Sequence, residues 1–115
     1  MRNLGRLKLP KISIEEKQKL ISTTVNFIKN ETTPIKTIVF GSILKESFDA
    51  QSDIDVVAIY KTPQEADLAR RKLYNIPRPT IIHPIEILCV DEQTFNKKSQ
   101  IGGIYAVAKE EGKEY

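Results

Sequence analysis

Apolar side chains recur at helical spacing near the start of the chain. Ser13 and Glu16 form a candidate capping box, and Asn30 is a plausible stop ahead of Pro34. The pattern therefore predicts a helix from about residue 14 to residue 30. Its apolar members repeat every three to seven residues: Ile14, Ile21, Val25 and Ile28.

Three short runs rich in β-branched residues predict strands over residues 35–40, 53–60 and 80–90. The run 53–60 is apolar on both faces after its acidic start, so we expect it inside the sheet. Pro84 interrupts the third run, which favours an edge position or a bulge there, because proline cannot donate to a strand ladder.

Further helices are predicted between and after these strands, and their order with the strands is α-β-α-β-α-β-α-α. This order indicates an α/β (α+β) fold, a small mixed sheet with flanking helices. The remaining helices are a brief one at 43–47, one opened by Thr62 and Pro63, one running from Asp91 to about Lys98, and a last one over 104–110 that stops at Gly112.

The length of 115 residues fits one domain, residues 1–115. With 40% hydrophobic and 29% charged residues, the chain is neither a disordered tail nor a fibre. No apolar run reaches the roughly 18 residues of a membrane helix, and the first residues do not resemble a signal peptide. The single cysteine, Cys89, cannot form an internal disulfide, and we expect a buried small side chain in a reducing, cytoplasmic setting.

The net charge of +3 is mild, but the first eleven residues carry only basic charges: Arg2, Arg6, Lys8 and Lys11. We interpret this segment as a solvated arm, and contact with phosphate or a partner is the alternative. Binding to nucleic acid and self-association both stay open.

One segment carries a recognisable chemistry. Gly41 and Ser42 follow directly on a predicted strand and open a predicted helix. Free N–H groups at such a point favour phosphate, glycine permits close approach, and serine adds a hydroxyl. The sequence therefore predicts a phosphate-binding turn here, although Ser42 could serve only as a helix cap.

Asp53 and Asp55 lie two positions apart on a predicted strand, so both side chains project from one face. Two neighbouring carboxylates repel one another unless a cation neutralises them, and oxygen ligands suit Mg²⁺ or Mn²⁺. Glu86 is the candidate third acid, embedded in an apolar strand on the same face as Ile82 and Leu88, with His83, Ile85, Ile87 and Cys89 on the other face.

This arrangement of Gly41-Ser42, ten residues, Asp53-x-Asp55 and a later acid resembles the DNA polymerase β-like nucleotidyltransferase superfamily. The minimal, stand-alone nucleotidyltransferases are the most similar group, and the resemblance covers about residues 35–90. It implies the polymerase β-like fold. It also implies transfer of a nucleoside monophosphate, AMP in the simplest case, from ATP or another NTP to a hydroxyl.

The resemblance also implies roles for single residues. Gly41 and Ser42 would hold phosphates, Asp53 and Asp55 would bind the metal, and Glu86 would help bind it and assist the acceptor hydroxyl. Three positions depart from the common pattern: Lys45 stands where many members have arginine, Ser47 where they often have glutamate, and Glu86 where the third acid is often aspartate. Lys45 is a phosphate-binding candidate with less directional hydrogen bonding.

Stand-alone members often act with a small helical HEPN-type protein, as the antitoxin of a toxin–antitoxin pair, and the resemblance implies a partner tyrosine as acceptor. The alternative is a catalytically silent module that binds a nucleotide or a partner. Glu86 could also be a structural ion-pair acid and Lys45 a solvated lysine. His83 is expected to be structural or exposed, Tyr105 to lie in the core or an interface, and Gly102-Gly103 to permit tight helix packing.

Overall fold

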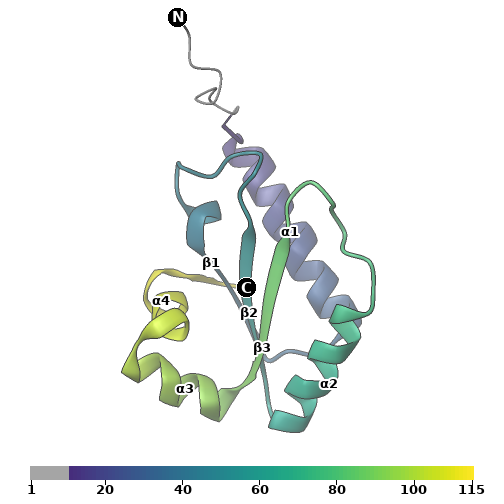
Figure 1. Ribbon diagram of the computed structural model, residues 1–115, viewed down its shortest axis with the longest axis vertical. Coiled ribbons are helices and arrows are strands. Elements are labelled where there is room, and N and C mark those ends of the chain that lie inside the picture. The colour runs from purple at the N-terminus through teal and green to yellow at the C-terminus, as the bar shows by residue number, and fades with distance from the viewer. Residues whose placement is uncertain (1–10) are drawn as a thin grey trace, which may run out of the picture.

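The computed structural model describes residues 11–115, which form a four-stranded mixed sheet between two pairs of helices (Figure 1). The strands have the spatial order β3-β2-β1-β4. β2 runs antiparallel to β1 and parallel to β3, and β4 runs antiparallel to β1. Their bounds are β1 Lys36–Phe40, β2 Ile54–Tyr60, β3 Ile85–Asp91 and β4 Lys113–Glu114. The predicted mixed sheet with flanking helices is confirmed.

The helices divide between the two faces of the sheet. Figure 1 shows α1 and α2 on one side of the strands and α3 and α4 on the other. A single 3-10 turn, η2, follows β1 directly. The bounds are α1 Ile14–Glu31, η2 Gly41–Leu44, α2 Pro63–Tyr74, α3 Glu92–Ile101 and α4 Gly103–Glu111.

The helix starts follow the capping signals. The Ser13 hydroxyl accepts the Glu16 backbone N–H at 3.1 Å and itself contacts the Glu16 carboxylate at 3.3 Å. This differs from a full capping box, in which the glutamate would return to the backbone N–H of the cap. Thr62 accepts the Glu65 N–H at 3.1 Å, with Pro63 at the first helical position, as predicted for α2.

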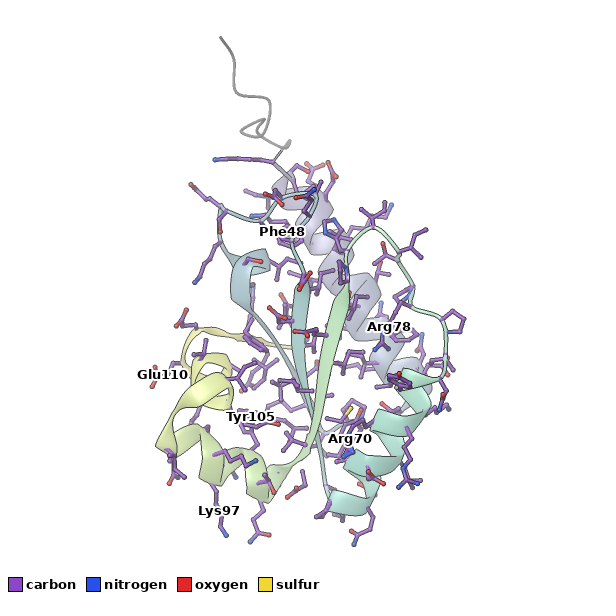
Figure 2. The ribbon with its side chains drawn as sticks, in the orientation of Figure 1. Phe48, Arg70, Arg78, Lys97, Tyr105 and Glu110 are labelled. Carbon is purple, nitrogen blue, oxygen red and sulfur yellow. The ribbon has the colours of Figure 1, made fainter. Side chains whose placement is uncertain are left out.

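Alternation along the strands produces two separate cores, because successive side chains point to opposite faces. The core beneath α1 and α2 takes Ile54, Val56, Ala58 and Tyr60 from β2 and Ile85 from β3, and Ile87 and Cys89 pack against it. Cys89, which was expected to be buried, is only partly buried. The core beneath α3 and α4 takes Val57 and Ile59 from β2, with Leu88 and Val90 from β3. Tyr105 points from α4 toward this second core (Figure 2) and meets Phe95 edge-on at 5.8 Å.

The third strand is shorter than the sequence predicted. It begins at Ile85 instead of residue 80, so Pro84 precedes the strand and does not interrupt it. The pairing of β2 with β3 is continuous from Ile54 with Ile85 onward, without a bulge. The predicted edge position of this strand is correct, since β3 ends the sheet order. Pro84 has no N–H to donate to the sheet, but its carbonyl accepts the Ile54 N–H at 2.8 Å.

The short strand β4 was not predicted. Gly112 ends α4, as expected, and the chain then turns onto β1, where Lys113 pairs with Val39. A side chain at Gly112 would clash with the Ala108 carbonyl and with the Ile38 side chain. Gly112 is therefore required by close packing at this turn and not only as a helix stop.

Gly102 and Gly103 do not allow tight packing, contrary to the sequence-based expectation. A side chain at either position would meet nothing within 4 Å. Their backbones have φ values of 139° and 75°, a region that L side chains rarely adopt. The pair therefore turns the chain sharply between α3 and α4.

No helix within residues 11–115 is both long and apolar enough to cross a membrane.

The basic arm predicted from Arg2, Arg6 and Lys8 lies outside the described residues. Lys11, its last member, is exposed and forms an isolated antiparallel bridge with Asp49.

Asp91 provides a test of the junction between β3 and α3. Its carboxylate accepts the Thr94 N–H at 3.0 Å, and its hydrogen bonding with Thr94 lowers its pKa from the usual 3.8. A lowered folded-state pKa means that the stabilisation is present above about pH 4 and is lost as the pH falls through the folded-state value. Asp91→Ala should therefore cost about 0.5–2 kcal/mol at pH 7 and less at pH 3.

The measurement is urea unfolding at both pH values. Asp91→Asn is the matched control, since its amide oxygen can still accept the hydrogen bond but carries no charge. A loss for Asp91→Ala that is the same at pH 7 and pH 3 would show that the charge contributes nothing.

Candidate active site

Gly41 brings the end of β1 against the Asp55 carboxylate of β2. Phe40 and Asp55 are register partners in the antiparallel pair, so the next residue, Gly41, turns beside this carboxylate. A Cβ added to Gly41 would lie 2.7 Å from Asp55 Oδ2, and the Gly41 φ of 85° also disfavours a side chain. The predicted phosphate turn and the predicted metal ligand are therefore in contact.

Glu86 lies beside Asp55 on the neighbouring strand. The two residues are register partners in the parallel pair of β2 and β3, so their side chains share one face of the sheet. This is the face expected from the alternation along β3. However, Glu86 is exposed, and the expectation of an acid enclosed by apolar neighbours is wrong, because the edge of the sheet leaves this side chain open to solvent.

Asp53 completes the group from just outside the strand. The structure begins β2 at Ile54, one residue later than predicted, so Asp53 stands at the entrance to the strand. Asp53 is exposed and Asp55 half-buried.

Negative charge accumulates at this point. Burial, then the adjacent Glu86 carboxyl and then the Asp53 charge raise the pKa of Asp55 above 3.8. Among residues 11–115, the ion pairs involve none of these three carboxylates. Each ionised carboxylate therefore raises the free energy needed to ionise its neighbours, and a bound cation would lower that free energy.

The donor set suits a divalent cation shared with a substrate. Within the described part of the chain, no group of three or more His, Cys, Asp or Glu side chains is arranged as a complete metal site. Mg²⁺, however, is commonly held by one or two carboxylates together with substrate phosphates. Asp55 with its two acidic neighbours, facing a turn that a side chain would block, fits that incomplete kind of site.

Ser42 lies in the 3-10 turn, and its carbonyl accepts the Lys45 N–H at 2.9 Å. The helix predicted at 43–47 is this single turn at Gly41–Leu44, so the site has no long helix whose dipole could contribute. The Lys45 side chain is 61% exposed and pairs with Glu111 of α4 at 3.7 Å. Lys45 is therefore close to the turn but engaged outside the carboxylate group.

The sequence comparison agrees with this geometry. The model of a family described as nucleotidyltransferase domain matches residues 10–115. The chain belongs to this family. No curated protein and no solved structure matches it significantly. The family match confirms the resemblance drawn from the motif, the fold class, and transfer of a nucleoside monophosphate as the general chemistry.

Two residues that support the turn of this nucleotidyltransferase were not found from its sequence. Lys17 of α1 donates from Nζ to the Lys45 carbonyl at 2.6 Å, and Glu111 pairs with the Lys45 side chain. Both contacts join segments that are far apart in the chain. A basic residue on an amphipathic helix gives no local signal for such a contact.

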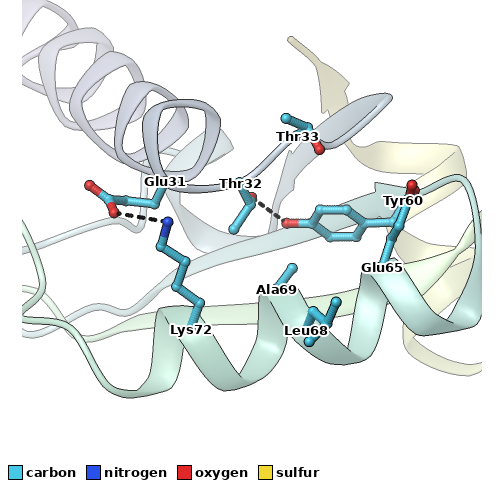
Figure 3. A pocket seen from close by; sticks show the side chains of 8 residues that line it. All are labelled: Glu31, Thr32, Thr33, Tyr60, Glu65, Leu68, Ala69 and Lys72. Carbon is cyan, nitrogen blue, oxygen red and sulfur yellow. Dashed lines mark hydrogen bonds and ion pairs between the residues drawn. The ribbon is translucent and has the colours of Figure 1, made fainter.

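A separate pocket of the nucleotidyltransferase lies at the opposite end of β2, beside Tyr60 (Figure 3). Its Tyr60 hydroxyl is already hydrogen-bonded to Thr32 at 2.7 Å, and its Lys72 ammonium pairs with Glu31 at 3.7 Å. These polar groups of the pocket are thus already paired with one another. The pocket contains neither the phosphate turn nor the three acidic residues, so the site at Gly41 is the better candidate.

Gly41→Val tests the contact between the turn and the carboxylate. The substitution should lower stability by about 1–2 kcal/mol through the left-handed backbone. It should also weaken binding of Mg²⁺ and nucleotide more than Ser42→Ala does, because the added side chain displaces Asp55. The measurement is calorimetric titration with ATP and Mg²⁺.

Gly103→Val is the matched control, since Gly103 also has a positive φ but faces open space. It should lose stability and keep nucleotide binding. The opposite ranking of Gly41→Val and Ser42→Ala would assign the main contribution to the Ser42 hydroxyl.

Proposed function

We propose that this nucleotidyltransferase transfers AMP from ATP to a hydroxyl group and releases pyrophosphate. The observation that supports the proposal best is the contact between Gly41 and Asp55, with Glu86 as the register partner of Asp55 on the next strand. A turn open to phosphate thereby adjoins carboxylates that no described cationic side chain neutralises. ATP is the donor that we propose for this chemistry.

Each residue has a definite part in the proposal. Gly41 leaves room for the phosphates, and Ser42 offers them a hydroxyl. Asp53 and Asp55 hold Mg²⁺ or Mn²⁺, and Glu86 contributes a third oxygen ligand from β3. The cation, when bound, neutralises charge that develops on the transferring phosphoryl group. Positioning and charge compensation then supply most of the rate enhancement.

Glu86 has a second part, as the base for the acceptor. It is exposed, whereas Asp55 is half-buried, so an incoming hydroxyl can reach Glu86 from solvent. A carboxylate in that position can accept the proton as the oxygen attacks phosphorus. Lys45 would bind phosphate only after its ion pair with Glu111 breaks. Exposed ion pairs of this kind are typically weak.

The acceptor is proposed from the family resemblance. Stand-alone members often act with a HEPN-type helical protein in toxin–antitoxin pairs, and a tyrosine of such a partner is the acceptor we propose, in the cytoplasm. A catalytically silent binding module is the second candidate. The pairing of Lys45 with Glu111, away from the carboxylates, favours it. Incubation with labelled ATP, Mg²⁺ and a HEPN-type partner separates the two, since only the transferase labels the partner.

The double variant Asp53→Asn, Asp55→Asn tests the metal pair. It should weaken Mg²⁺-dependent ATP binding by more than the roughly 10–100-fold typical of changes around a metal ligand. Its metal-free stability should be equal to or above that of the wild type, because like-charge repulsion is removed. Calorimetric titration and thermal unfolding measure the two effects.

Asp67→Asn is the control, because Asp67 is an acid of α2 paired with Arg70 and Arg71, away from the site. It should leave ATP binding unchanged. An unaltered ATP–Mg²⁺ affinity in the double variant would refute the proposed metal site.

Glu86→Gln tests the third carboxylate of the proposed site. It should keep nucleotide binding through the remaining residues and slow transfer about 10²–10⁴-fold through loss of the base. Single-turnover labelling of the acceptor gives the rate, and unfolding without metal gives the stability, which should not fall. The exposed Glu110 on α4 (Figure 2) is the control position, as Glu110→Gln. A variant with near wild-type transfer and earlier melting would place Glu86 outside the active site.

A further inference from the structure

Each polar group of Ser52, the residue before Asp53, has a hydrogen-bond partner. The Ser52 N–H donates to the Asp49 carbonyl at 3.1 Å, and the Ser52 hydroxyl joins the Asp49 N–H at 3.1 Å and its carboxylate at 3.2 Å. The Ser52 carbonyl, the last polar group before Asp53, lies 2.9 Å from His83 Nδ1. The backbone that leads into Asp53 is therefore fixed on all sides.

His83 is built to hold that carbonyl. It is only 3% exposed, and its ring stacks on Phe48 with centroids 5.0 Å apart. Phe48 is itself fully buried at the top of the sheet (Figure 2). Because a carbonyl oxygen can only accept, Nδ1 carries the hydrogen and donates it to Ser52. The structural role of His83 is thus to hold one peptide group, the one between Ser52 and Asp53.

A second bond clamps the other side of Asp53. The Ile54 N–H donates to the Pro84 carbonyl at 2.8 Å. The consecutive residues 83 and 84, which lead into β3, therefore contact the peptides before and after Asp53. Since β3 also carries Glu86 beside Asp55, this junction sets Asp53 relative to both other carboxylates.

We infer that His83 is a positioning residue for the metal site, and that its Nδ1–H holds the Ser52 carbonyl so that Asp53 is placed before metal and nucleotide arrive. This inference rests on the proposed function, because it assumes that Asp53 is a metal ligand. Groups that orient metal ligands typically change metal affinity 10–100-fold when removed. A histidine that only filled the core would affect stability and leave metal affinity unchanged.

The test compares His83→Asn with His83→Leu. The asparagine Nδ2 can occupy roughly the place of His Nδ1 and donate, whereas leucine fills similar space without a donor. The first measurement is the dissociation constant of Mn²⁺ in the presence of ATP, by electron paramagnetic resonance, at a temperature where every variant is folded. His83→Leu should raise it roughly 10–100-fold, and His83→Asn should restore most of the affinity.

The second measurement is amide hydrogen exchange over residues 51–55 without metal. Exchange should be faster in His83→Leu than in His83→Asn, because the peptide is no longer fixed. Phe48→Leu is the control for lost stacking, since it leaves the His83 donor in place, and it should weaken Mn²⁺ binding less than His83→Leu does. If His83→Leu does not fold, His83→Gln replaces it, because its donor lies one bond too far out.

Asp53→Asn separates this inference from the function on which it rests. If Asp53→Asn loses Mn²⁺ affinity while His83→Leu keeps it, the role of His83 is overturned and the site stands. Equal losses in His83→Asn and His83→Leu would also overturn it, because the donor would then not matter. If Asp53→Asn binds Mn²⁺ and ATP normally, Asp53 is not a metal ligand, and both this inference and the part given to Asp53 in the proposed function are overturned.

Discussion

The backbone at Gly41 runs so close to the Asp55 carboxylate that a single carbon atom there would lie 2.7 Å from an oxygen. The antiparallel register of β1 and β2 produces this approach, because it sets Phe40 opposite Asp55 and leaves Gly41 to turn immediately beside it. The parallel register of β2 and β3 then adds Glu86. Two strand pairings thus assemble one site from three separate segments, at the cost of crowding negative charge.

Much of this arrangement could be predicted because it depends on local alternation. On β3, residues Ile85, Ile87 and Cys89 face one core, which leaves Glu86 on the face that carries Asp55. The period of two along a strand fixes that assignment as soon as the strand is recognised. The capping residues Ser13, Thr62 and Asp91 mark helix starts for the same reason, since each acts within three residues of itself.

Other features depend on residues that are distant in sequence, and no local pattern predicts them. β4 pairs with β1 only because Gly112 can pass close to Ile38. Pro84 indicates the edge position of β3, but the apolar neighbours of Glu86 in sequence do not indicate that this side chain is exposed. His83 shows the same limit: its burial was one of two expectations, but its contact with Ser52 spans 31 positions of the chain.

The two faces of the sheet are unequally packed, and this has a consequence for motion. The core under α1 and α2 contains fourteen of the described buried residues, whereas the core under α3 and α4 contains seven. Regions with fewer buried apolar side chains open at lower free energy. The α3–α4 hairpin, turned at two glycines with open space around them, is therefore the part that should separate first from the sheet. Asp55 and Glu86 lie on the same face of the sheet as this hairpin. The site therefore borders the part of the molecule that opens at lower free energy. An acceptor as large as a protein side chain could reach the site there without disturbing the core under α1 and α2.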